Sequence, residues 1–433
     1  MRRSMALWFL CLANAACASP PVEAPTGFDG ASNGLVEQAT HDKDREDFDE
    51  TETIEDGLGP LYNAQACREC HQDPISGGAS QVTELRVGHR GKQDAFENPE
   101  IPIARGKEII RNRSLVNDRA ICPNGEFPAV EIHERVPERE NIRTLRVSVP
   151  LLGDGFVEAV ADQTLIDLAR QQCRSSGNKI CGQVIRVPIV EAPGETGVGR
   201  FGWKNQHASL LSFSADAYLN EMGITSELAP DEVTRLCDTA AQPNDQPDEE
   251  GLAGIDRFAR FIRATKAPAR DAVLAATPQA ELGAKLFEKT GCAACHVATL
   301  VTAPAGTNVN GGKFTVSAAL GDKAFHPYSD FLLHDVGTGD GIVMAMEEHY
   351  GHNMYQIKWK DISYPSFRTT ANKIRTAPLW GLRLRTRLMH DGASVTVADA
   401  IARHVKEGEQ SAKKFAALQR KDREALLIFL DSL

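Results

Sequence analysis

The chain carries the stretch Cys67-Arg68-Glu69-Cys70-His71 and, much later, the stretch Cys292-Ala293-Ala294-Cys295-His296. Both have the pattern C-x-x-C-H, in which two thiols bond covalently to the vinyl groups of a c-type haem. The histidine, His71 or His296, then becomes the proximal ligand of the iron. A C-x-x-C pair can also bind zinc or cycle as a dithiol, but the immediate flanks offer no further pair of zinc ligands. We therefore expect two covalently bound c-type haems.

The N-terminus has the pattern of an export signal. Arg2 and Arg3 precede a short apolar run over residues 5–12, and small residues up to Ala18 supply cleavage sites. Lipid attachment at Cys17 is the alternative. We expect residues 1–18 to be a signal peptide and the protein to be periplasmic, or an outer-membrane lipoprotein that meets the membrane only through a lipid at Cys17. No later run approaches the length of a membrane span.

Charge and length limit the partners and the number of domains. The formal net charge is -11 and no basic patch stands out, which argues against nucleic acid as a partner. The 433 residues are enough for two or three domains with separate cores. Ten acidic residues within 37–56 indicate a solvated, poorly ordered segment. We expect an acidic linker over 19–56, an N-terminal haem domain over 57–240 and a C-terminal haem domain over 241–433.

Hydrophobic periodicity predicts a mainly α chain. The pattern indicates strands over two segments, 143–149 and 183–190. It predicts helices over 209–222, 231–239, 252–265, 279–290, 396–407 and 422–433. The expected fold is therefore two cytochrome c-like haem domains with a small β-containing insertion in the first.

Four cysteines lie outside the leader and the two haem stretches: Cys122, Cys173, Cys181 and Cys237. In an oxidising compartment an even number of cysteines favours disulfides, and four allow three connectivities. We favour a pair between Cys173 and Cys181, which would close a short polar loop. Free buried thiols are the alternative.

Several longer motifs resemble known di-haem enzymes. The C-terminal half is similar to the second domain of bacterial di-haem cytochrome c peroxidases and of the methylamine-utilisation di-haem enzyme, in residues 375–380, 389–392, 394–401 and 422–433. From about residue 55 to 433, the chain more closely resembles a family of di-haem oxidoreductases often labelled thiol oxidoreductases or peroxidases. Those matches are residues 56–63, 199–204, 220–225 and 327–335. The cysteine pairs give the thiol oxidoreductase label no support, because haem attachment accounts for them.

The resemblance implies a second axial ligand on the haem held by His296. The peroxidases use a methionine, and the matching position here is His404, after Asp399 and Ala400. Imidazole in place of a thioether lowers the haem potential. The alternatives are that His404 is a surface residue on an amphipathic helix, or that His390 is the ligand.

The resemblance also implies the residues of peroxide chemistry at the haem held by His71. Glu221 matches the distal glutamate that moves a proton between the two peroxide oxygens, although a lone glutamate is often only a helix-end ion pair. Gln206 is expected to line the same pocket. Trp203 matches an electron relay between the haems, with core packing as the alternative. His89 lies near the position of a displaceable distal ligand, with solvent exposure as the alternative.

Two further expectations concern the cation and the overall activity. Thr376 and Pro378 match backbone-carbonyl ligands of a calcium ion between the haems. The expected function is that of a periplasmic di-haem oxidoreductase that reduces hydrogen peroxide, with electrons entering at the C-terminal haem from a small redox protein or a quinol-linked donor. The alternatives are a plain electron-transfer cytochrome, or an enzyme that oxidises a protein or another organic substrate.

Overall fold

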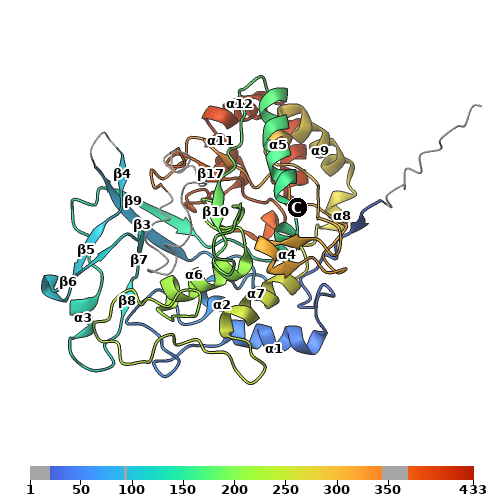
Figure 1. Ribbon diagram of the computed structural model, residues 1–433. Helices are drawn as coiled ribbons and strands as arrows, with labels where there is room; N and C mark the ends of the chain where they lie inside the picture. The colour runs from blue at the N-terminus through green and yellow to red at the C-terminus, as the bar shows by residue number, and fades with distance from the viewer. Residues whose placement is uncertain (1–19, 92–94, 344–368) are drawn as a thin grey trace, which may run out of the picture.

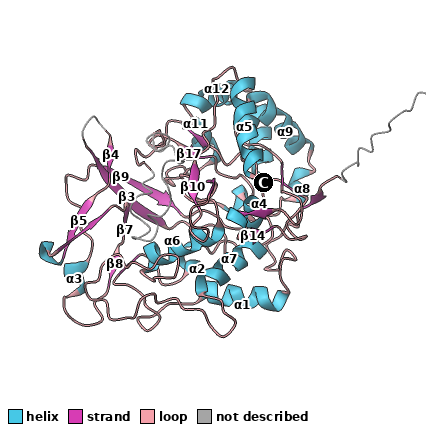
Figure 2. Cartoon of the chain, viewed as in Figure 1, coloured by secondary structure: helices cyan, strands magenta, loops and turns pink. Residues whose placement is uncertain are grey.

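The computed structural model describes residues 20–91, 95–343 and 369–433. Its helices are α1 (Gln38–Asp49), α2 (Cys67–Cys70), α3 (Ala129–Ile132), α4 (Asp154–Glu158), α5 (Asp162–Ser175), α6 (Leu210–Met222), α7 (Gly254–Ala264), α8 (Ala272–Ala275), α9 (Pro278–Thr290), α11 (Val397–Ala402), α12 (Glu409–Ala417) and α13 (Arg420–Asp431). Helix exceeds strand, and much irregular chain joins the elements (Figure 2), in agreement with a mainly α fold that contains β segments.

The strands are short and form several small sheets. They are β1 (Val22–Glu23), β2 (Leu61–Tyr62), β3 (Thr83–Arg90), β4 (Phe96–Glu97), β5 (Glu100–Ile103), β6 (Glu108–Arg111), β7 (Leu115–Val116), β8 (Arg119–Ala120), β9 (Ile142–Val147), β10 (Arg186–Pro188), β11 (Thr196–Val198), β12 (Leu300–Val301), β13 (Asn308–Val309), β14 (Phe314–Thr315), β15 (Lys323–Phe325), β16 (Leu333–His334) and β17 (Ile374–Arg375). The longest pairing joins β3 to β9 in antiparallel register, with Thr83 opposite Val147 and Gly88 opposite Ile142. This sheet and the β5–β6 hairpin project at the left of Figure 1, and the strand predicted over 143–149 is β9 of this sheet. The strand predicted over 183–190 is shorter, as β10, and pairs with β11 in a separate sheet.

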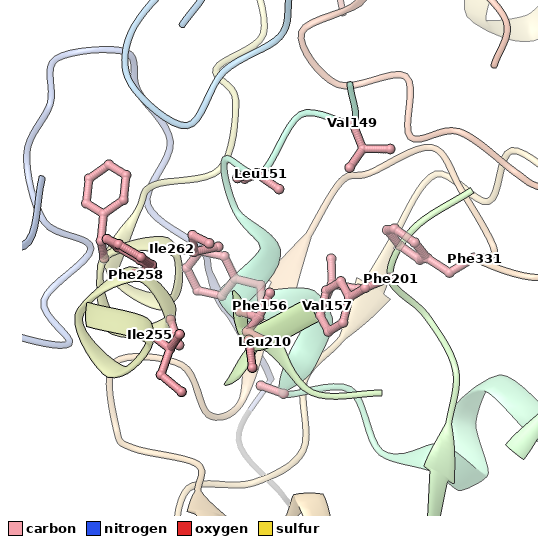
Figure 3. Packing of buried hydrophobic residues seen from close by; sticks show 14 of the residues in the cluster. Val149, Leu151, Phe156, Val157, Phe201, Leu210, Ile255, Phe258, Ile262 and Phe331 are labelled. Carbon is pink, nitrogen blue, oxygen red and sulfur yellow. The ribbon is translucent and has the colours of Figure 1, made fainter. Parts of the chain in front are cut away.

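The first lobe consists of α1, α2, α6 and α7, which lie together in the lower part of Figure 1. Helix α6 agrees with the prediction over 209–222, because Ser209 caps its first turn through its hydroxyl and Gly223 ends it in a left-handed conformation. Helix α7 packs against both α1 and α6. Its Ile255, Phe258 and Ile262 belong to the main apolar core, and Figure 3 labels them on this helix.

The acidic segment before the first haem stretch is folded, so the prediction of a solvated linker over 19–56 was wrong. Residues 38–49 form α1, whose buried Asp44 binds Arg260 of α7 through two contacts of 2.7 Å. On the same side of α1, Phe48 is 2% exposed in the core. The acids of this segment therefore include partners of arginines on α7, which composition alone does not reveal.

The second lobe consists of α9, α11, α12 and α13 around the second haem stretch. Helix α13 crosses α9 so closely that a Cβ at Gly283 would collide with the carbonyl oxygen of Ala425. Phe287 and Phe429 pack in this crossing with ring centroids 5.3 Å apart. The helix predicted over 422–433 is thus present as α13, and it packs on α9, which leads into the second C-x-x-C-H stretch.

The two lobes share segments, so a cut at residue 240 does not separate them. Strand β1 lies beside β15, far along the chain, in parallel pairing. Helix α7 falls within the range predicted for the C-terminal domain, yet it packs in the first lobe. In the part of the chain that the structure describes, no helix is both long and apolar enough to cross a membrane.

Two disulfides join the four remaining cysteines. Cys173 bonds to Cys181 as predicted, and Cys122 bonds to Cys237. The predicted helix over 231–239 is absent, since those residues form turns and bends that bring Cys237 to its partner. The four cysteines of the two C-x-x-C-H stretches are unpaired.

Candidate functional site

The first of two cavities surrounds the Cys67–His71 stretch. Both thiols and the imidazole line it. The empty space within it, including the part open to solvent, is about 1600 Å³. One face of α6 forms a wall, because Ser214, Tyr218 and Glu221 recur at the three- and four-residue spacing of a helix. Burial lowers the pKa of His71 to about 4, so its imidazole is neutral at physiological pH, the form that binds a metal. The unpaired thiols, neutral imidazole and large cavity fit a haem.

A pair of carboxyl groups lies in this cavity. Glu221 accepts a hydrogen bond of 2.8 Å from Asn63 Nδ2, and its side chain is hydrogen-bonded to that of Glu84 on β3. Burial and the nearby charge of Glu84 raise the pKa of Glu221 to about 8. Burial alone would raise the pKa of Glu84 too, but Arg86, with its Nε 2.6 Å from Glu84 Oε1, lowers it. At neutral pH the pair therefore holds one proton, on Glu221.

Glu84 and Arg86 are site residues that the sequence analysis missed. They occupy alternate positions of β3, so both side chains leave the same face of the strand. Charged residues on one face of a strand usually indicate solvent, and only the tertiary fold places this face beside α6. Within residues 83–90, charged residues at alternate positions are the signal that could have indicated a polar wall.

Trp203 lines both cavities. Its indole nitrogen donates a hydrogen bond of 2.7 Å to the carbonyl of Val147, and its ring centroid lies 6.2 Å from that of His390. The residue also belongs to the main apolar core, so the two alternatives considered for it are compatible. Gln206 lines the first cavity, as expected for it.

His89 does not lie in the first cavity. Its Nδ1 is 2.7 Å from Glu140 Oε2 and its Nε2 is 3.3 Å from Glu97 Oε2, so both ring nitrogens have carboxylate partners. Strand β3 carries the residue away from the site, because five residues of extended chain beyond Glu84 span roughly 17 Å. The position does not fit the predicted role of a distal haem ligand.

The second cavity surrounds the Cys292–His296 stretch, and His404 lines it together with His296. Nδ1 of His296 is 2.9 Å from the carbonyl of Tyr328, and Nδ1 of His404 is 2.8 Å from the carbonyl of Ala400. A carbonyl only accepts, so each Nδ1 carries the proton and each Nε2 keeps a lone pair for a metal. This donor set fits a haem with two histidine ligands.

His404 lies just beyond α11 rather than within the longer helix predicted over 396–407. Burial lowers the pKa of His296 to about 4, and His404 is the next largest cause of that shift. The competing candidate, His390, also lines the cavity, and its ring lies against that of Trp203 with centroids 6.2 Å apart. These relations favour His404 as the partner of His296.

A buried ionic network supports the second stretch. His334 Nε2 is 2.9 Å from Asp330 Oδ2, and its Nδ1 is 2.9 Å from Glu407 Oε2. Burial disfavours its charge, but the two carboxylates prevail and raise the pKa of His334 well above the ordinary value. The amide of Asp330 donates to the carbonyl of Cys295 at 2.9 Å, so the network is tied to the turn that carries Cys295.

The calcium prediction rests on the carbonyls of Thr376 and Pro378. Thr376 is 9% exposed, and its carbonyl accepts a hydrogen bond of 2.7 Å from Ser329 Oγ. Within the described ranges, the one cluster of His, Cys, Asp or Glu close enough to hold a metal ion is Cys295, Asp330 and His334. Its thiol belongs to the predicted haem attachment, so calcium binding stays a prediction.

The sequence of residues 126–433 matches the family described as "Di-haem oxidoreductase, putative peroxidase". The chain belongs to this family. The matched range contains Trp203, Glu221 and the second C-x-x-C-H stretch, and it begins after the first. Membership makes the protein a di-haem redox enzyme and haem its cofactor.

Comparison with solved structures gives distant matches. Xenon-pressurised hydrazine synthase of Kuenenia stuttgartiensis is 13% identical, with a TM-score of 0.40 and 100% of both chains covered. The diheme peroxidase BthA of Burkholderia thailandensis is 12% identical, with a TM-score of 0.33, over 96% of this chain and 94% of that one. A MauG-like protein associated with microbial copper homeostasis is 17% identical, with a TM-score of 0.24, over 41% and 52%. No curated protein matches the chain.

Proposed function

We propose that the protein is an exported di-haem c-type oxidoreductase that reduces hydrogen peroxide at its first haem and receives electrons at its second. The observation that carries the proposal is the difference between the two cavities. His296 and His404 both line the second, whereas His71 is the sole histidine among the described residues that line the first. In the first cavity, a pair of carboxyl groups takes the place of a second histidine.

Cysteines and histidines would hold the two haems. Cys67 and Cys70 would bind one covalently with His71 as its ligand, and Cys292 and Cys295 would bind the other with His296 and His404. When bound, the first haem supplies an iron that can bind peroxide and the second an iron that carries electrons. Trp203, which lines both cavities, would provide the contact through which electrons pass.

The carboxyl pair would move the protons. Reduction of one peroxide to two waters consumes two electrons and two protons, and one proton must move from the inner to the outer oxygen. Glu84, ionised beside Arg86, is the base of the pair, and Glu221 is the acid. Asn63 holds Glu221 in place through its hydrogen bond of 2.8 Å.

Location and partners belong to the same proposal. Residues 1–19, which include the predicted signal peptide and Cys17, lie outside the described residues. The two disulfides support export to the periplasm, because such bonds form and persist in an oxidising compartment. The donor would be a small redox protein or a quinol-linked donor.

Spectroscopy of the purified holoprotein tests the proposal. We expect mass spectrometry of the denatured chain to show two covalently attached haems. Electron paramagnetic resonance (EPR) should show a high-spin ferric haem beside a low-spin one, at rest or after one-electron reduction. Two low-spin haems in every state, for example with Met222 as a ligand in the first cavity, would contradict it. Glu221→Gln should abolish peroxide turnover and leave electron uptake intact.

A further inference from the structure

Tyr218 and Glu52 form a buried pair that the proposed chemistry does not use. The phenol hydroxyl donates a hydrogen bond of 2.7 Å to Glu52 Oε1. Each residue is 7% exposed. A phenol that donates to a buried carboxylate has a proton acceptor already in place.

The pair lies at the wall of the first cavity. The ring of Tyr218 lines that cavity one helical turn before Glu221, and Phe258 packs edge-on against it with centroids 5.0 Å apart. The thiol of Cys67 is close enough to interact electrostatically with both Tyr218 and Glu52. The phenol is thus a neighbour of the residue through which the first haem would be attached.

Burial sets the proton balance of the pair. It raises the pKa of Glu52 to about 7, and the hydrogen bond from Tyr218 opposes that shift. Burial and the charge of Glu52 both raise the pKa of Tyr218 above its ordinary value. At neutral pH the phenol therefore keeps its proton in the resting protein, and Glu52 can accept one when the phenol becomes acidic.

We propose that Tyr218 is a third redox centre, which gives one electron to the peroxide-oxidised first haem while its proton passes to Glu52. The inference rests on the proposed function, because peroxide is the oxidant. One O–H bond of the phenol breaks and one forms on Glu52, so the proton stays within the pair. As the electron leaves, a neutral tyrosyl radical replaces the phenol and the net charge of the pair rises from -1 to 0. The electron contributes to the two that reduce peroxide, so turnover can begin when the second haem supplies only one.

Rapid-freeze EPR of the holoprotein mixed with hydrogen peroxide tests the inference. We expect a tyrosyl radical signal whose hyperfine splitting collapses when the protein is made with ring-deuterated tyrosine. Tyr218→Phe should abolish the signal. Tyr62→Phe, which alters a tyrosine of β2 that lines neither cavity, should leave it unchanged. Glu52→Gln should slow radical formation about a hundredfold, the lower end of what a positioned base contributes. Haem absorbance confirms that each variant is loaded.

The outcomes separate this inference from the proposed function. Suppose that the wild type consumes peroxide. If it forms no tyrosyl radical, or if Tyr218→Phe keeps the radical, then Tyr218 is only a structural hydrogen-bond donor and the inference is overturned. If the wild type does not consume peroxide, the proposed function fails. Flash photolysis with a ruthenium tris-bipyridine complex and persulfate then oxidises the holoprotein without peroxide. A radical at Tyr218 under those conditions supports its redox role, and its absence overturns it.

Discussion

Replacement of Glu84 by glutamine should slow peroxide turnover, because it removes the base of the pair, and should move the alkaline limit of the remaining turnover to lower pH. Glutamine keeps the size and hydrogen-bonding ability of the side chain but removes the charge beside Glu221. That charge is the second largest cause, after burial, that raises the pKa of Glu221 from 4.5 to about 8. Without it, Glu221 loses its proton at lower pH, and the acid that turnover needs disappears sooner.

The size of the shift follows from Coulomb's law. Two unit charges about 4 Å apart interact by about 4 kcal/mol at an effective dielectric constant of 20, which corresponds to about 3 pKa units. The open mouth of the cavity admits solvent and reduces this value. We therefore expect the alkaline limb of the pH profile to move to lower pH by about 1 to 3 units. The larger value is the Coulomb limit, and the smaller is that of a charge pair screened by solvent.

The assay is the steady-state rate of peroxide reduction by a small-molecule reductant, measured as a function of pH. The profile shows the acidic and the alkaline limb of activity directly. Asp118→Asn is the matched control, because Asp118 lines the same cavity but its side chain is exposed, so that solvent screens its charge. The control should keep the wild-type profile. If Glu84→Gln keeps both turnover and the wild-type alkaline limb, Glu221 is not the acid or Glu84 does not set its pKa, and the assignment of the pair is wrong.

Three further predictions concern ligation and stability. His404→Ala should convert the second haem from low-spin to high-spin in absorption and EPR spectra, whereas His390→Ala should leave it low-spin; the reverse result would exchange their roles. His404→Met should raise the midpoint potential of that haem in a redox titration, because a thioether raises the potential relative to imidazole. Asp44→Ala should lower the free energy of unfolding in urea by about 2 kcal/mol, because it removes charge-assisted hydrogen bonds to Arg260; an unchanged midpoint would mean that this pair does not anchor α1.

Local patterns in the sequence were enough for the features that depend on neighbours along the chain. The C-x-x-C-H stretches, the capped helix α6 and the short loop closed by Cys173 and Cys181 belong to this class. Composition misled where an element depends on a distant partner. The acidic run became α1 because Arg257 and Arg260, some 210 residues later, face Asp47 and Asp44.

The residues of the candidate site show the same difference between local patterns and distant partners. Glu221 was found because it lies in a motif on one helix, but its chemistry depends on Glu84, which comes from a strand 137 positions earlier. A lone buried glutamate would be ionised at neutral pH if a cation lay beside it, and it would be neutral if none did. A pair with Arg86 beside only one member is different, because the arginine fixes which carboxyl is ionised and leaves the other as the acid. The fold thus turns two ordinary carboxylates into a candidate base and a candidate acid. Among the residues that the structure describes, it does so in one of the two cavities that contain the same five-residue pattern.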